Sequence, residues 1–190
     1  MLENRREMVR WVADRLTVIA AVWLAAGLAV SVFVVWAFIE LADEVLEGES
    51  RGFDRAVLLW IHSHSPGWLN EPMRLVTALG YFWAVLPLLA VAVVLFYRIG
   101  WRLSAVLLVV STGGSIVLTT VLKGVFKRAR PELIDSGYHA SFYSFPSGHA
   151  TVAVGFYGML TVILAYRLEG LARWAVVVSG VLVVLLIGFS

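Results

Sequence analysis

Five long apolar runs, separated by shorter polar segments, dominate the pattern of this chain. They lie at about residues 17–39, 81–97, 103–122, 148–166 and 174–190. The first run has 23 residues, and a helix of that length rises about 34 Å, enough to cross a hydrocarbon core of about 30 Å. The pattern therefore predicts an all-α membrane helical bundle with five transmembrane helices, in a single membrane domain over residues 1–190.

The polar segment at residues 40–75 is acidic, with seven Asp and Glu side chains against three Arg. Four of its large apolar residues would share one face of a short helix: Phe53, Val57, Trp60 and Ile61. His62 and His64 lie two residues apart, so they would not share a helix face. We therefore expect a short amphipathic extracytoplasmic helix here and no pair of metal ligands.

Composition supports the membrane assignment. Hydrophobic residues make up 61% of the chain and charged residues 15%, and the mean hydropathy is +0.87. Soluble domains carry about a quarter charged residues. The net charge of +2 gives no support for a nucleic-acid partner. Because the chain has no cysteine, disulfides and thiolate sites are excluded.

The distribution of charge predicts an orientation. The N-terminal segment and the short turns at 98–102 and 167–173 are basic and fall on one side by alternation, which the positive-inside rule makes the cytoplasm. Residues 40–75 and 123–147 fall on the other side. The protein is thus predicted to cross the cell's inner (cytoplasmic) membrane several times with its N-terminus in the cytoplasm. Yet residues 123–147 are basic, and a basic segment on the extracytoplasmic side needs a separate reason.

A cluster of cations opens that segment: Lys123, Lys127, Arg128 and Arg130, followed by Pro131. Lys123 and Arg130 are seven residues apart, about two helical turns, so they would share a face if the helix continues. Arg offers a planar fork to a phosphate and Lys a point charge. The cluster therefore indicates a phosphate-binding site.

The same segment closes on Pro146, Ser147, Gly148 and His149. Ser147 is a favourable N-cap for the fourth span, and Gly148 lets an anion approach the backbone. The first N–H groups of a helix form an anion site. His149, in the first turn, could protonate the leaving oxygen of a phosphate ester.

Each feature alone has an ordinary explanation. The cations could bind anionic lipid headgroups as an anchor, although such anchors belong to the cytoplasmic face. Ser147 and Gly148 could be a simple helix cap, and His149 an interfacial histidine. A small transporter is a weaker alternative, because no span carries the charged residues of a translocation path. The cation cluster, the Ser147–Gly148 helix start and His149 all lie on one predicted side of the membrane, and this combination favours a dedicated active site.

Lys123-x6-Arg130-Pro131 followed by Pro146-Ser147-Gly148-His149 resembles the first two signature motifs of the type 2 phosphatidic acid phosphatase superfamily. This family includes bacterial membrane phosphatases acting on phosphatidylglycerol phosphate and undecaprenyl pyrophosphate. The resemblance implies six transmembrane helices and a two-step hydrolysis that needs no metal and no cofactor.

The resemblance also implies the role of each residue. Lys123 and Arg130 would bind the phosphoryl oxygens, with Ser147 and the Gly148 N–H completing the cradle. His149 would be the catalytic general acid. The family's nucleophile is a second histidine, which forms a phospho-histidine and belongs to a third motif, Ser-Arg-x5-His-x3-Asp. The implied partners are a lipid phosphate substrate and membrane lipids.

The third motif is not complete in this sequence, which reaches Ser190 at the position of its serine. We therefore expect a truncated lipid-phosphate phosphatase that would act at the outer face of the membrane. The 190 residues alone should bind a lipid phosphate weakly and turn over little or nothing. The alternative is a catalytically inactive membrane protein that binds lipid phosphates with the same cradle.

The gene itself separates these two hypotheses. If the chain is a truncated phosphatase, the codons after Ser190 encode Arg at once, His six residues later and Asp four beyond that. Sequencing the gene past this codon checks the prediction. A stop codon directly after Ser190 would instead favour the inactive binding protein.

Overall fold

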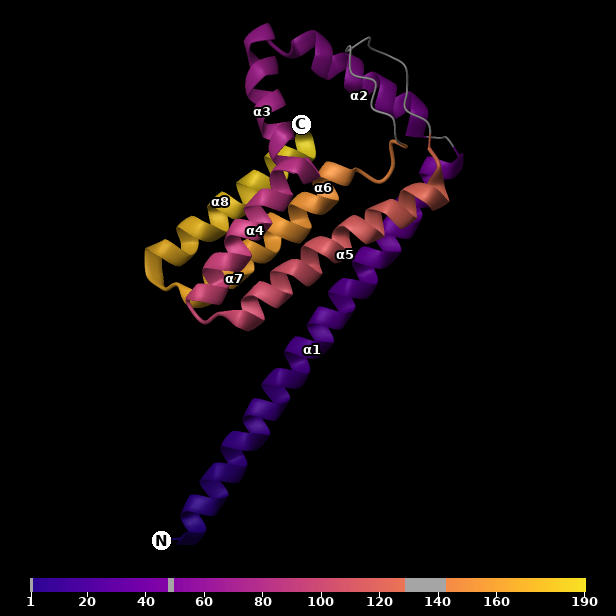
Figure 1. Cartoon of the computed structure of the whole chain (residues 1–190). Helices are drawn as coiled ribbons and strands as arrows, with labels where there is room; N and C mark the ends of the chain where they lie inside the picture. The colour runs from indigo at the N-terminus through magenta and orange to yellow at the C-terminus, as the bar shows by residue number, and fades with distance from the viewer. Residues whose placement is uncertain (1, 48–49, 129–142) are drawn as a thin grey trace. The chain divides into compact units, whose positions relative to one another are not determined.

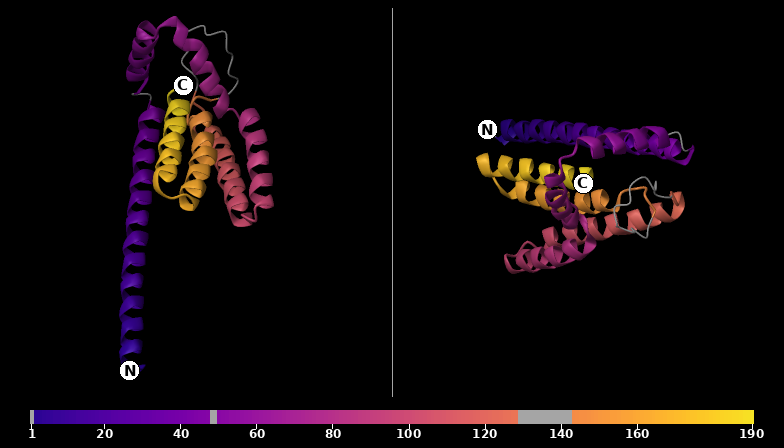
Figure 2. Two further views of the ribbon diagram at one scale, coloured as in Figure 1. Left: turned by 90° about the vertical axis from the view of Figure 1, so that its left-hand side faces the viewer. Right: turned by 90° about the horizontal axis from the view of Figure 1, so that it is seen from above.

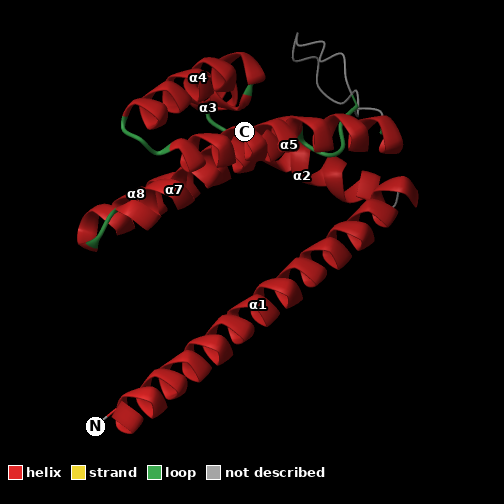
Figure 3. Ribbon diagram, turned by 60° about the horizontal axis from the view of Figure 1, so that its bottom comes forward, coloured by secondary structure: helices red, strands yellow, loops and turns green. Residues whose placement is uncertain are grey.

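The computed structural model describes residues 2–47, 50–128 and 143–190. Within these ranges every regular element is a helix (Figure 3). The chain forms two compact units, Met1–Asp54 and Arg55–Ser190, and each is described by itself. The prediction of an all-α membrane bundle is confirmed, because four long apolar helices and one bent helix pair are candidate spans among the described residues.

The first unit consists mainly of helix α1, Leu2–Glu47. Its stretch Thr17–Glu44 contains an 18-residue window with a mean hydropathy of 2.6 and is long enough to cross a membrane. Such a helix, apolar all round, is typical of a membrane span. It extends several residues beyond the predicted end of the first run at residue 39.

The acidic segment at residues 40–75 begins within α1 and is largely helical over its described residues. Helix α2, Ser50–His64, is longer than the amphipathic stretch predicted around Phe53 to Ile61. At its end, His64 Nδ1 lies 2.8 Å from Trp60 O and the two rings stack with centroids 4.8 Å apart. These two contacts of His64 with Trp60 stabilise the C-terminal turn of α2. A 3-10 turn, η1, Gly67–Leu69, leads into helix α3, Asn70–Gly80.

A sharp bend joins α3 to helix α4, Phe82–Arg98. Tyr81 between them is extended, with φ −70° and ψ 141°, and the two helical parts are bent by 56°. The hydroxyl of Tyr157 donates a hydrogen bond of 3.0 Å to Leu79 O, just before the bend. The break therefore has a fixed position in the bundle.

Three further helical segments complete the second unit (Figures 1 and 2). Helix α5, Arg102–Phe126, packs against α4. The next span is continuous from Gly148 to Arg167 and consists of α6, Gly148–Ala153, a π-helical turn η2, Val154–Gly158, and α7, Met159–Arg167. Helix α8, Gly170–Phe189, runs back beside it. The Gly148–Arg167 span is central, because it contacts α3, α5 and α8.

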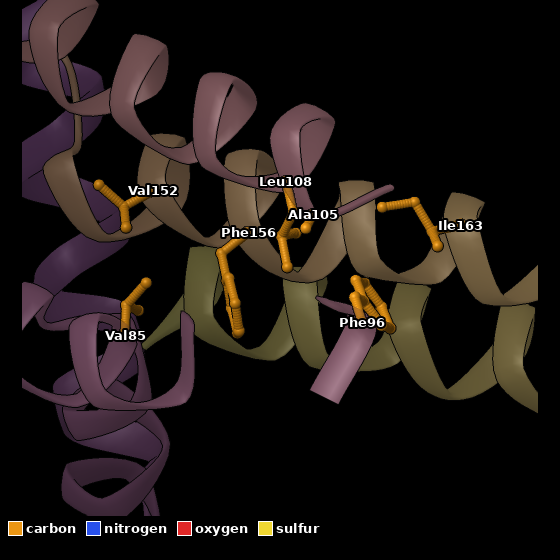
Figure 4. Close-up of a cluster of buried hydrophobic side chains, with 7 residues drawn as sticks. All are labelled: Val85, Phe96, Ala105, Leu108, Val152, Phe156 and Ile163. Carbon is orange, nitrogen blue, oxygen red and sulfur yellow. The ribbon is translucent and has the colours of Figure 1, made fainter. Parts of the chain in front are cut away.

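The buried core is small, as suits a bundle whose outer surface faces lipid. Figure 4 shows a cluster of seven buried apolar side chains: Val85, Phe96, Ala105, Leu108, Val152, Phe156 and Ile163. They come from α4, α5 and the Gly148–Arg167 span. Packing of these side chains holds the three helices together without a driving force from water.

The π-helical turn η2 marks a close approach between α5 and the central span. Ser111 Oγ donates a hydrogen bond of 2.9 Å to Gly155 O. A Cβ atom on Gly155 would collide with the Ser115 hydroxyl and would lie 3.0 Å from the backbone oxygen of Ser111. Gly155 is therefore required for the two backbones to lie this close.

The variant Gly155→Ala should be destabilised by roughly 1–3 kcal/mol, because overpacking at a rigid contact forces backbone shifts. Gly158→Ala in the same turn is the matched control, since its Cβ would meet only Val154 Cγ1, at 3.8 Å. Unfolding of both variants in detergent micelles, followed by circular dichroism, measures the difference. Equal stability of the two variants would contradict the close packing at Gly155.

Candidate active site

The first candidate motif begins on the last turns of α5. This helix ends at Phe126, and Lys127 forms a left-handed C-cap with φ 45° whose N–H bonds to Lys123 O at 3.0 Å. Helix α5 therefore ends before residue 130, so the predicted pairing of Lys123 and Arg130 on one continuous helix face stays untested. Arg130 and Pro131 lie outside the described residues.

Lys123 turns toward the second motif. Its Nζ lies 3.9 Å from the position that a Cβ on Gly148 would occupy, and its Cε lies 3.8 Å from that position. The ammonium also donates a hydrogen bond of 2.8 Å to Tyr143 O. Two residues that are 25 positions apart in sequence are thus neighbours, as the phosphate-site prediction requires.

The chain on either side of residues 129–142 is tied together. Ser144 donates from its N–H and from its hydroxyl to Arg128 O, at 2.9 and 3.2 Å. The rings of Phe126 and Phe145 meet edge to face with centroids 5.2 Å apart. These contacts place the end of α5 beside the start of α6.

Ser147 caps the central span as predicted. Its Oγ accepts a hydrogen bond from Ala150 N at 3.3 Å, and its carbonyl accepts from Thr151 N and Oγ1 at 3.1 and 2.8 Å. The sequence signal was local, a serine in front of a small-residue helix start, which explains why it could be found. The first N–H groups of the helix, from Gly148 on, have no acceptor within the helix.

His149 lies in the first turn of α6 and is partly buried. Its imidazole meets the ring of Tyr81 at a right angle, with centroids 4.3 Å apart. Its Cβ lies 3.0 Å from the position of a Cβ on Gly80. The candidate proton donor is therefore packed against the bend between α3 and α4.

Thr119 is a neighbour of the second motif that the sequence analysis did not identify as a candidate site residue. It precedes Lys123 by one helical turn, and its Cγ2 lies 3.7 Å from the Cβ position of Gly148. The residue is only 6% exposed, and its hydroxyl makes no hydrogen bond within the described part of the chain. By contrast, Thr112 and Thr120 on the same helix each donate to the carbonyl four residues earlier. Thr119 lies four residues before Lys123, so the sequence alone indicated that the two side chains share one face of the helix.

The electrostatics of this arrangement favour an anion. The amino end of a helix carries a partial positive charge, so a cation beside it is unfavourable by about 0.3–1 kcal/mol. The Lys123 ammonium lies at the amino end of the continuous span Gly148–Arg167. A phosphate between them would remove the repulsion and accept hydrogen bonds from both sides.

Comparisons with known proteins identify similar sequences and a similar fold. The sequence model of the PAP2 superfamily matches residues 104–190. The chain is 34% identical over 128 residues to phosphatidylglycerophosphatase B of Bacillus subtilis (strain 168), covering 65% of this chain and 61% of that protein. It therefore spans about 61% of the length of this curated relative. Its fold matches the crystal structure of a transmembrane PAP2 type phosphatidylglycerolphosphate phosphatase from Bacillus subtilis with a TM-score of 0.70 and 29% identity. That match covers 80% of this chain and 76% of the other.

Gly148→Ala tests the anion site separately from the fold. An added Cβ would meet its nearest neighbours at 3.7–3.9 Å, which is ordinary contact, so the variant should fold normally. Its methyl group would occupy the space beside the Lys123 ammonium, and we expect inorganic phosphate to bind about tenfold more weakly, as for a lost hydrogen bond to a charged group. Titration calorimetry in detergent measures the change. Gly113→Ala, in open space on α5, is the control, and equal affinity of both variants would contradict the site.

Proposed function

We propose that the chain is a PAP2-type membrane lipid-phosphate phosphatase that hydrolyses a phosphomonoester or pyrophosphate of a lipid. It is a multi-pass membrane protein, with several apolar helices long enough to span a bilayer. The observation that carries the proposal is the Lys123 ammonium at the amino end of the Gly148–Arg167 span. Two positive groups that face one another are best explained by an anionic ligand between them.

In the proposed complex, the phosphoryl group lies between Lys123 and the first turn of α6. The Lys123 ammonium and the Gly148 N–H contact its oxygens, and the Ser147 hydroxyl can donate to them while its oxygen caps the helix. Arg130, two residues after Arg128, is proposed to supply a bidentate contact. The lipid tail then extends into the bilayer.

His149 is proposed to act as the general acid. A histidine nucleophile attacks phosphorus, the bond to the leaving oxygen breaks, and its electron pair takes the proton of the His149 imidazolium. Water then cleaves the phospho-histidine, releasing inorganic phosphate. The nucleophilic histidine belongs to the family's third motif, which the 190 residues do not contain in full.

Charge supports an outer-face location for the reaction. The two turns at the opposite end of the bundle carry Arg98, Arg102 and Arg167, and the Arg167 guanidinium lies 4.4 Å from the centre of the Trp101 ring. Basic turns favour the cytoplasmic side. The Lys123–His149 site, one membrane span away, would then act on lipids of the outer leaflet.

A membrane protein that binds lipid phosphates without hydrolysing them is the second candidate, because the Lys123–Gly148 arrangement by itself supports binding of an anion. Such a protein would bind the same lipid phosphates through Lys123 and Gly148. Turnover separates the two functions directly.

The test is release of inorganic phosphate from phosphatidylglycerol phosphate by the complete gene product in detergent, with EDTA present. We expect turnover to persist in EDTA, and His149→Ala to lower kcat by about 10²–10⁴-fold with little change in KM, because it removes a proton donor used in the transition state. His64→Ala is the matched control, since His64 packs on Trp60 in α2. Loss of activity in EDTA, or an equal change in binding and turnover, would argue against this mechanism. If the unaltered protein releases no phosphate, the result favours the second candidate, a protein that binds lipid phosphates without hydrolysing them.

A further inference from the structure

We infer that the bend between α3 and α4 positions the His149 imidazole, with Gly80 and Tyr81 as its positioning residues. The inference rests on the proposed role of His149 as the proton donor. It adds to that role a second segment of the chain, about 70 residues away in sequence, that neither signature motif includes.

Gly80 provides the first contact, and its lack of a side chain is essential to it. A Cβ on Gly80 would lie 3.0 Å from His149 Cβ and 3.2 Å from His149 Cδ2. On its other side it would lie 2.7 Å from Cγ2 of Ile187 on α8. The backbone of the bend therefore fills the space between His149 and α8, and any added atom would displace the imidazole or α8.

Tyr81 provides the second contact. Its ring lies at a right angle to the imidazole, with centroids 4.3 Å apart and an interplanar angle of 89°. Edge-to-face pairs of this kind contribute about 0.5–1.5 kcal/mol beyond the area they bury. The imidazole is thus held on its side by a ring and at its base by the Gly80 backbone.

The backbone of Tyr81 is itself fixed. Its N–H bonds to Ala78 O at 3.2 Å, and its carbonyl accepts from Ala84 N and Val85 N, both at 2.9 Å. Tyr81 therefore ends α3 and begins α4 at once. The tyrosine ring has a rigid attachment, which a residue in a loose loop would lack.

The bend is also tied to the helix that carries His149. Tyr157, two turns further along that span, donates to Leu79 O at 3.0 Å. Three consecutive residues of the bend, Leu79, Gly80 and Tyr81, thus contact one face of the central span. In Figure 1 the lower end of α3, the start of α6 and the C-terminal end of α8 lie together.

These contacts restrict the rotamers that the His149 side chain can adopt, and this matters for its proposed role as proton donor. A histidine in the first turn of a membrane helix would otherwise sample several staggered rotamers. The Gly80 backbone next to His149 and the Tyr81 ring against its imidazole restrict these rotamers, so the orientation of the imidazole is limited. A displacement of about 1 Å at a reacting group can lower the rate about a hundredfold.

The structural part of the test is NMR of the protein labelled with ¹³C on its histidine rings, which needs no turnover. The His149 signals, assigned by their loss in His149→Gln, should shift in Tyr81→Leu because the ring current of the tyrosine is removed. Tyr81→Phe should keep them near their original position, because the aromatic ring remains. His149 signals that do not move in Tyr81→Leu would overturn the contact.

The functional part is phosphate release by the complete gene product. Gly80→Ala and Tyr81→Leu should lower kcat by about tenfold to a hundredfold with KM nearly unchanged, and Tyr81→Phe should recover most of the rate. Gly113→Ala, in open space on α5, and Phe82→Leu, at a residue that is 43% exposed, are the matched controls and should keep kcat.

The two parts distinguish the possible failures. If the NMR contact is present but the unaltered protein releases no phosphate, the proposed function fails while the packing holds. If the protein is active and the Gly80 and Tyr81 variants keep kcat, or lose it together with their fold as judged by NMR, the positioning role is overturned. A loss of kcat in a folded Tyr81→Leu variant that Tyr81→Phe restores supports it.

Discussion

The repulsion between a lysine and a helix end is the constraint on which this site depends. Lys123 ends close to Gly148, where the backbone of a 20-residue helical span presents its positive end. Left alone, such a pair lowers stability. The protein keeps it by anchoring the ammonium to Tyr143 O and by tying Ser144 to Arg128. An arrangement that costs stability and is held by several contacts is typical of functional sites.

The rest of the second unit serves to hold this pair in place. The helix α5 supplies Lys123, and its close packing on the central span at Gly155 sets the distance between the two motifs. The bend at Tyr81 supplies the surface on which His149 rests. A small buried core is sufficient, because in a bilayer close backbone packing and hydrogen bonds replace the hydrophobic effect between helices. The site is thus built where three helix ends meet.

The sequence predicted the spans and the Ser147 cap, because both depend on local patterns: a run of apolar residues and a serine before a helix. It could not predict where α5 ends, since the left-handed turn at Lys127 depends on the following chain folding back to Arg128. The helical content of residues 50–80 was underestimated for a similar reason. Gly80 and Tyr81 had no local signal for contact with His149, and only the spacing of Thr119 from Lys123 indicated a shared face.

The most direct measurement is a crystal structure of the protein soaked with tungstate, a phosphate analogue that is located by its anomalous scattering. The account predicts one tungstate between the Lys123 ammonium and the Gly148 N–H, with both nitrogens about 2.7–3.1 Å from its oxygens. The same crystal form of Lys123→Gln should show weak or no anomalous density there. Strong density elsewhere on the protein, or an unchanged Lys123–Tyr143 contact with no anion beside Gly148, would contradict the account.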